Sequence, residues 1–152
     1  MSDDAPPRWP MHSPLTELLH LPPFHKNMQD WPLEVADPAR LPELCDFYET
    51  EPLDRETRFS LMQLIVFSLD DAAEMELDGI SEIEKSEIEK RVETLLRRDF
   101  ELHFHTVDYW RRHDEIALDS LLENHRTFAI TPMMRRIWND CFKPEYHRWL
   151  RE

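Results

Sequence analysis

The spacing of apolar residues along the chain predicts helices rather than strands. Residues 59–69, FSLMQLIVFSL, are apolar on almost every side, with polar interruptions at Ser60, Gln63 and Ser68, as is typical of a buried central helix. We expect this helix to run from about residue 53 to 77. A second long helix is expected to start at Ser81 and to continue past residue 100. Its apolar stripe contains Leu96, Phe100, His103, Val107 and Trp110.

Shorter helices are predicted on either side of these two. The first opens at Pro38 or Pro42 and runs to about Tyr48, and two others cover about 114–125 and 132–142. A last turn carries Tyr146, Trp149 and Leu150. Residues 100–105, FELHFH, alternate like a strand, but the long helical context favours a helix there. The chain has a single glycine, Gly79, and no Asn-Gly or Asp-Gly turn between alternating segments. The predicted fold is therefore all-α, a bundle of about five helices.

The N-terminal part has a different composition. Residues 1–43 hold nine of the twelve prolines, which predicts an extended arm, because proline fixes φ and removes a hydrogen-bond donor. The arm is also apolar, so we expect it to pack on the body of residues 44–152, or on a second copy as a homodimer. The side chains expected to be buried are Trp9, Leu15, Leu18, Leu19, Phe24 and Trp31.

The charge of the chain is strongly negative, at −14. Residues 70–93 hold ten acidic and three basic residues, a net charge of −7. Such an excess disfavours contact with nucleic-acid phosphates and favours a basic partner. The start, MSDDAPPRW, does not resemble a signal peptide, and the longest apolar run, Leu64–Phe67, is too short to span a membrane. With two cysteines and no disulfide framework, a cytoplasmic protein is expected.

The acidic stretch could be a calcium loop or a corner between two helices. A calcium loop needs a bidentate Glu at its twelfth position, and counted from Glu74 that position holds Lys85. Gly79 is instead expected to end one helix in the left-handed conformation. We predict that the acids bind a basic protein partner through Asp70, Asp71, Glu74, Glu76, Asp78 and Glu82.

The histidines offer one candidate metal site. Glu101, His105 and Asp108 would share a helical face, which is a spacing that metal ligands use. Arg97 and Arg112 lie four residues from Glu101 and Asp108, so a solvated face of ion pairs is favoured, and no metal or other cofactor is expected. On the same helix His103 is expected to be buried and His105 exposed.

Residues 98–103, RDFELH, resemble the R-[DNH]-x3-H pattern of the HEPN ribonuclease family, whose members are small helical bundles. The resemblance implies metal-independent RNA cleavage by Arg98 and His103. In an unbroken helix these two side chains would point about 140° apart.

The sequence favours a non-enzymatic cytosolic binding or assembly module with an acidic surface around residues 70–93. Two alternatives remain. One is a HEPN-like ribonuclease that uses Arg98 and His103. The other is a small acidic inhibitor or immunity-type protein for a basic partner.

Overall fold

The computed structural model describes residues 5–8, 15–21, 32, 35–74, 82–111 and 129–150, with only the backbone described at 73–74 and 82–84. The described residues form seven α-helices and two 3-10 helices, and they contain no strand. The elements are α1 (Leu15–Leu18), η1 (Pro38–Arg40), α3 (Leu41–Thr50), α4 (Arg55–Glu74), α5 (Glu82–Arg98), α6 (Phe104–Trp110), α8 (Thr131–Cys141), η2 (Pro144–Tyr146) and α9 (His147–Leu150). The prediction of an all-α bundle is confirmed.

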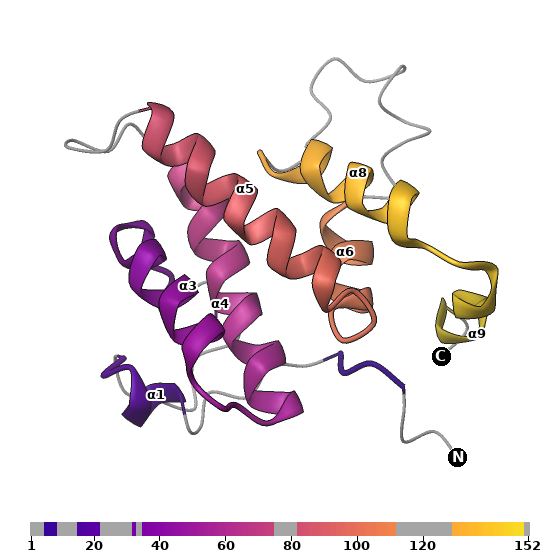
Figure 1. Cartoon of the computed structure of the whole chain (residues 1–152), viewed down its shortest axis with the longest axis horizontal. Coiled ribbons are helices and arrows are strands. Elements are labelled where there is room, and N and C mark those ends of the chain that lie inside the picture. Colours follow the sequence, from indigo (N-terminus) through magenta and orange to yellow (C-terminus); the bar gives the residue numbers. More distant parts are fainter. Residues whose placement is uncertain are drawn as a thin grey trace.

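The helices pack in two groups (Figure 1). In the first group α3, α4 and α5 each contact the other two, and α1 also packs on α4. In the second group α6 packs on α8, and α8 also contacts α5. The two groups meet where α5 contacts α8 and where α4 contacts α6, through the Gln63–Thr106 hydrogen bond and the rings of Phe67 and Trp110.

The central helix α4 is buried as its sequence predicts. Phe59, Leu61 and Ile65 are fully covered. The polar interruptions of this helix all make hydrogen bonds: Ser60 donates to the carbonyl of Glu56, Gln63 donates to the hydroxyl of Thr106 on α6, and Ser68 accepts from the backbone N–H of Asp37. Each of these three polar side chains thus has a partner, which avoids the cost of an unpaired one. The helix starts after Asp54, whose carboxylate accepts from the backbone N–H of Thr57 as an N-cap.

The long helix predicted from Ser81 past residue 100 is in fact two helices. α5 ends at Arg98, a turn covers residues 99–103, and α6 begins at Phe104. A continuous helix would carry Phe104 about 80° away from Leu96, outside the predicted stripe. After the break Phe104 is fully buried. Its ring lies between 5.0 and 5.8 Å from the rings of Trp138, Trp149 and Tyr146.

Part of the N-terminal arm packs on the body. Leu15, Leu19 and Leu21 are buried in the common core, whereas Leu18 is 49% exposed, so its predicted burial is wrong. α1 is a single turn, and one side of it necessarily faces solvent. Trp9, Phe24 and Trp31 lie outside the described residues. The homodimer through this arm stays a prediction.

The end of α1 is closed by a left-handed residue. His20 has φ of 53°. The backbone N–H of Leu21 donates to Thr16, and that of His20 donates to Glu17. This pair of bonds is a Schellman motif, in which glycine is the usual left-handed residue.

Two arginines fasten the segment 5–8 to distant parts of the chain. Arg55, in the first turn of α4, donates to the carbonyl of Ala5 at 2.6 Å, and Arg8 donates to the carbonyl of Trp149 at 3.1 Å. This segment therefore runs between the start of α4 and the C-terminal helix α9 (Figure 1). No helix in the described ranges has the length and apolar character that crossing a bilayer requires.

Candidate functional site

The turn between α5 and α6 contains a chain of hydrogen bonds centred on Tyr48 of α3. The hydroxyl of Tyr48 donates to Oδ2 of Asp99 at 2.6 Å and lies 2.8 Å from Nε2 of His103. Because that hydroxyl proton goes to Asp99, its oxygen must accept a proton from Nε2 of His103. The neutral imidazole is therefore protonated at Nε2. On its other side Asp99 accepts from Arg98 at 3.0 and 3.3 Å.

His103 is fully buried, as predicted from its place in the apolar stripe. Its ring stacks on Phe59 with centroids 6.2 Å apart. Among the described residues its second nitrogen, Nδ1, has no hydrogen-bond partner. Burial lowers the pKa of His103 to about 3, a shift that the nearby charge of Asp99 opposes. His103 is therefore a neutral core residue near pH 7.

Arg98 and His103 are brought together, contrary to the prediction that they diverge. That prediction assumed an unbroken helix, and the break at residues 99–103 removes the assumption. Arg98, Asp99, Tyr48 and His103 form one connected network. The two motif residues differ in access, however, because the Arg98 side chain is 53% exposed and His103 is fully covered.

A cleft of about 830 Å³ opens next to this network. Its walls come from the first turn of α4, the end of α5, the turn that follows, and the end of α8 with η2. The lining residues are Arg55, Arg58, Arg97, Arg98, Asp99, Phe100, Glu101, Leu102, Asp140, Cys141, Phe142, Lys143 and Tyr146. His103 does not line it. These residues come from three separate parts of the sequence, around residues 55–58, 97–102 and 140–146, which is why no local pattern indicated the cleft.

The cleft has a positive surplus on a strongly negative chain. Five lining residues are Arg or Lys and three are Asp or Glu, a difference of two positive charges. Each of the three carboxylates is already hydrogen-bonded: Asp99 to Arg98 and Tyr48, Glu101 to the hydroxyl of Tyr146, and Asp140 to Arg97. The negative charges in the cleft are thus partly neutralised by their neighbours.

The ionisation of two of these groups follows from the same contacts. Burial alone would raise the pKa of Asp99, but the hydrogen bonds from Arg98 and Tyr48 outweigh it and the pKa is lowered. Burial, with the bond to Glu101, raises the pKa of Tyr146 to about 12. Asp99 is therefore a carboxylate near pH 7 and Tyr146 keeps its proton.

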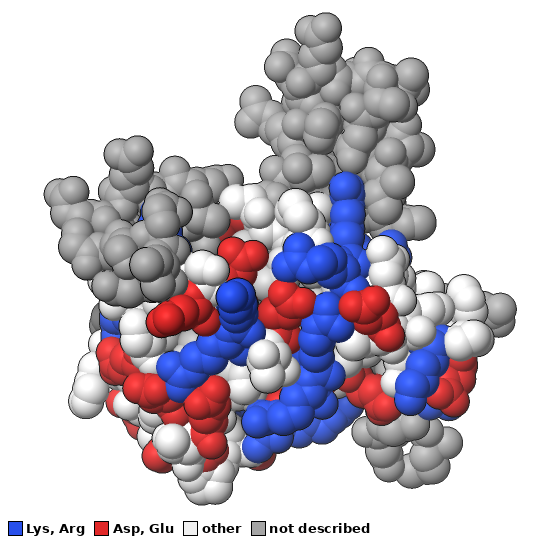
Figure 2. Space-filling view, turned by 45° about the horizontal axis from the view of Figure 1, so that its top comes forward, with Lys and Arg blue, Asp and Glu red and all other residues white. Residues whose placement is uncertain are grey.

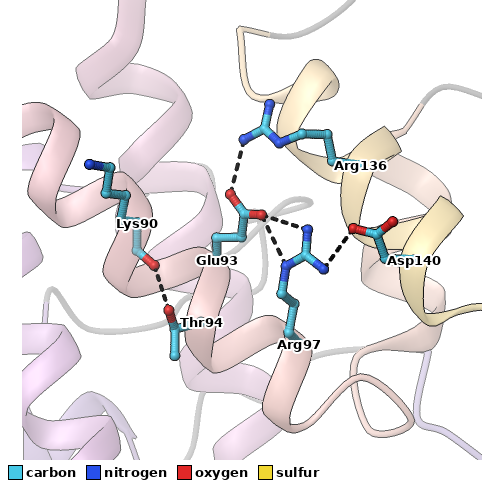
Figure 3. Close-up of polar contacts among 6 residues, drawn as sticks. All are labelled: Lys90, Glu93, Thr94, Arg97, Arg136 and Asp140. Carbon is cyan, nitrogen blue, oxygen red and sulfur yellow. Dashed lines mark hydrogen bonds and ion pairs between the residues drawn. The ribbon is translucent and has the colours of Figure 1, made fainter.

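Ion pairs fix one wall of the cleft to the other (Figure 3). Arg97 of α5 donates to Glu93 at 2.7 and 3.0 Å and to Asp140 of α8 at 2.9 Å. Arg136 of α8 donates to the second oxygen of Glu93 at 2.9 Å. Exposed ion pairs contribute only about 0–1 kcal/mol each, so their main effect here is to set the position of α8 against α5.

Figure 2 shows how charge is distributed on one face of the molecule. Lys and Arg side chains gather in a band there, with Asp and Glu side chains on both sides of it. The net charge of −14 therefore does not describe the local surface.

The predicted partner-binding acids are only partly described. Asp70 is a correction: it is 7% exposed, and its Oδ1 accepts from the backbone N–H of Ile130 at 3.3 Å. A carboxylate at the end of the buried helix α4 is thus a structural group that cannot face a partner. Asp71 is half-buried. The side chains of Glu74, Glu76, Asp78 and Glu82 lie outside the described residues, as do Gly79 and the predicted corner.

The three candidate metal ligands are not brought together as a site. Glu101 lies in the turn before α6 and binds Tyr146, and Asp108 accepts from Arg111 at 2.7 Å. His105 is half-buried rather than exposed, and burial lowers its pKa to about 4. The described residues contain no group of three or more His, Cys, Asp or Glu that could hold a metal ion.

Comparisons with known proteins add no assignment. No family model matches the chain, and no curated protein or solved structure matches it significantly.

Proposed function

We propose that this protein is a non-enzymatic binding module whose cleft receives an acidic segment of a protein partner. The observation that carries the proposal is the positive surplus of the cleft on a chain with a net charge of −14. Asp99 and Asp140 offset part of this positive charge, and the remaining surplus of cations would attract an anionic ligand, because unlike charges attract each other.

The net charge of the chain does not prevent this contact. At physiological salt the Debye length is about 8 Å, so charges that are further away are largely screened. A carboxylate inside the cleft would interact mainly with Arg58, Arg98 and Lys143, which line it. Arginine also holds carboxylates through two parallel hydrogen bonds, which adds orientation to affinity.

The state of His103 supports a non-enzymatic reading. A general acid or base works best with a pKa near the working pH, and it must reach its substrate. His103 has a pKa of about 3, is fully buried, and uses Nε2 to bind Tyr48. These features are those of a hydrogen-bonded core histidine.

The proposal is tested with a peptide of four consecutive glutamates flanked by glycines, and with its glutamine counterpart. Calorimetry at 0.15 M salt should show binding of the glutamate peptide and none of the glutamine peptide. Replacing Arg58 and Lys143 together by Ala should weaken binding at least tenfold, because each hydrogen bond between charged groups contributes about 1.5–3 kcal/mol.

A control removes a cation from outside the cleft. Lys90 is exposed, does not line the cleft and takes no part in the ion pairs between α5 and α8, so Lys90→Ala should bind as the wild type does. Equal binding of both peptides, or equal weakening by Lys90→Ala and by the double cleft variant, would rule out the cleft as the binding site.

A second candidate function, the HEPN-like ribonuclease, is supported by one observation. The helix break joins Arg98 and His103 through Asp99 and Tyr48. The test is incubation of a single-stranded RNA oligonucleotide with the protein in the presence of EDTA. The binding-module proposal expects no cleavage above buffer. If the wild type cleaves the RNA and both Arg98→Ala and His103→Ala abolish the cleavage, the ribonuclease function would replace the binding-module proposal.

The acidic stretch 70–93 remains a separate proposal for a basic partner. Because Asp70 is buried, this proposal rests only on the excess of acidic residues in that stretch of the sequence. Substituting Glu76 and Asp78 by Lys should weaken binding of a basic partner and leave the glutamate peptide unaffected.

A further inference from the structure

We propose that the preferred ligand of the cleft is a phosphorylated side chain of the partner, a phosphomonoester, held by Arg58, Arg98 and Lys143. This inference rests on the proposed function, since it specifies the anion that the same cleft receives. It follows from the hydrogen-bond donors that remain in the cleft and from the local charge.

The carboxylates of the cleft leave a defined set of cations for a ligand. Asp99 and Asp140 are bound by Arg98 and Arg97, Glu101 accepts a hydrogen bond from Tyr146, and among the described residues none of the three carboxylates forms an ion pair with Arg58 or Lys143. In the described part of the chain, Arg58 donates to the carbonyl of Leu53 at 3.3 Å and pairs with no carboxylate.

The donors of Arg58 and Lys143 face few competing acceptors. The Nε atom of Arg58 is buried and, within the described ranges, has no hydrogen-bond acceptor. Lys143 is exposed at the end of α8 and carries three N–H donors.

Arg98 adds a third cation at the rim. It uses Nε and Nη2 to hold Asp99, and 53% of its side chain is exposed. Donors from α4, α5 and the end of α8 would thus meet in one cleft. Three sources of donors suit the three oxygens of a phosphoryl group better than the two of a carboxylate.

The local charge indicates the same ligand. The lining has two more cations than anions, and a phosphorylated side chain carries about −1.5 to −2 charges near pH 7. A glutamate carries one negative charge, and so does each phosphodiester of a nucleic acid. Nucleic-acid binding also favours a basic surface that extends along the strand, whereas these cations meet in one cleft of an acidic chain.

The experiment compares three fluorescent heptapeptides with Gly and Ser flanks and a central phosphoserine, glutamate or serine. We expect fluorescence anisotropy at pH 7.5 to give phosphoserine at least tenfold tighter binding than glutamate, with no binding of serine. The preference should shrink towards pH 5.5, because the second phosphate pKa is about 6, whereas glutamate stays ionised. Lys143→Ala should reduce phosphoserine affinity at least tenfold, and Lys90→Ala should leave it unchanged.

The other outcomes contradict the inference in distinguishable ways. Equal affinity for the phosphoserine and glutamate peptides would overturn it and leave the proposed function standing. Binding of neither peptide would overturn both. Inorganic phosphate competing as strongly as the phosphopeptide would show that the free anion is the ligand. Tighter binding of a short single-stranded RNA than of the phosphopeptide would assign the cleft to nucleic acid.

Discussion

The buried, neutral His103 makes the stability of this protein depend on pH in a specific window. In the unfolded chain its pKa is about 6.5, and in the folded protein burial lowers it to about 3. Between these values the unfolded state binds a proton that the folded state does not. The free energy of unfolding must therefore fall as pH decreases through 6.5, and it must continue to fall towards 3.

The size of the effect follows from the two pKa values. Between pH 7 and pH 5 the contribution of His103 should decrease by about 2 kcal/mol, since one pKa unit corresponds to about 1.4 kcal/mol. His105, with a folded pKa of about 4, adds in the same direction, but it is only half-buried and its share is smaller. The pKa of an unperturbed carboxyl group is about 4, so most of the titration of unfolded-state carboxyl groups lies below this window.

The assay is urea unfolding followed by tryptophan fluorescence at pH 5, 6 and 7. Gln at position 103 does not titrate and keeps an N–H donor for Tyr48. In the wild type the free energy of unfolding should fall between pH 7 and pH 5 by about 2 kcal/mol more than in the variant His103→Gln. This comparison does not depend on the absolute stability of the variant. An unchanged pH dependence in this variant would refute the assignment of a depressed pKa, and with it the argument against His103 as an acid or base.

Three further substitutions test the contacts described above by urea unfolding. Tyr48→Phe should destabilise the protein by about 2–4 kcal/mol, because it removes a hydrogen bond to a carboxylate and leaves Nε2 of His103 buried without a partner; an unchanged stability would contradict the network. His20→Gly should stabilise by about 0.5–1 kcal/mol, since glycine adopts positive φ without steric cost, and a loss of stability would argue against the Schellman motif. Asp70→Ala should destabilise by about 1–3 kcal/mol because the backbone N–H of Ile130 loses its acceptor, whereas a neutral effect would return Asp70 to the surface.

The fold could be predicted from the sequence where the hydrophobic pattern is strong and local. The continuous apolar run of α4 and the prolines in the first turns of α3 and α8 place those helices correctly within a few residues. The break between α5 and α6 could not be predicted, because residues 99–103 contain neither Gly nor Pro. The alternation of apolar and polar residues in FELHFH, residues 100–105, was the only local departure from the helical pattern near this break. Packing of Phe104 against three aromatic residues from distant parts of the chain outweighs the local helical period.

The candidate site could be predicted only in part. Its motif residues, Arg98 and His103, were found from the sequence, and the burial of His103 followed from the stripe. The cleft depends on tertiary contacts between residues as distant as Arg55 and Lys143. The net charge also concealed it, because the acids outnumber the bases over the chain as a whole. The available signals were the adjacent arginines at the end of α5 and the composition of residues 126–152, which hold six basic and three acidic residues.

The most direct test of the account is to observe which arginines meet the ligand. Nitrogen-15 NMR resolves the side-chain Nε–H groups, and the glutamate peptide is added to the full-length protein. We expect the signals of Arg58 and Arg98 to shift with the same affinity, while that of Arg91, which is held by Asp46 and Glu49 on another part of α5, stays in place. Shifts at Arg91 as large as those at Arg58 and Arg98, or no shift at these two, would contradict the claim that the cleft binds an acidic partner.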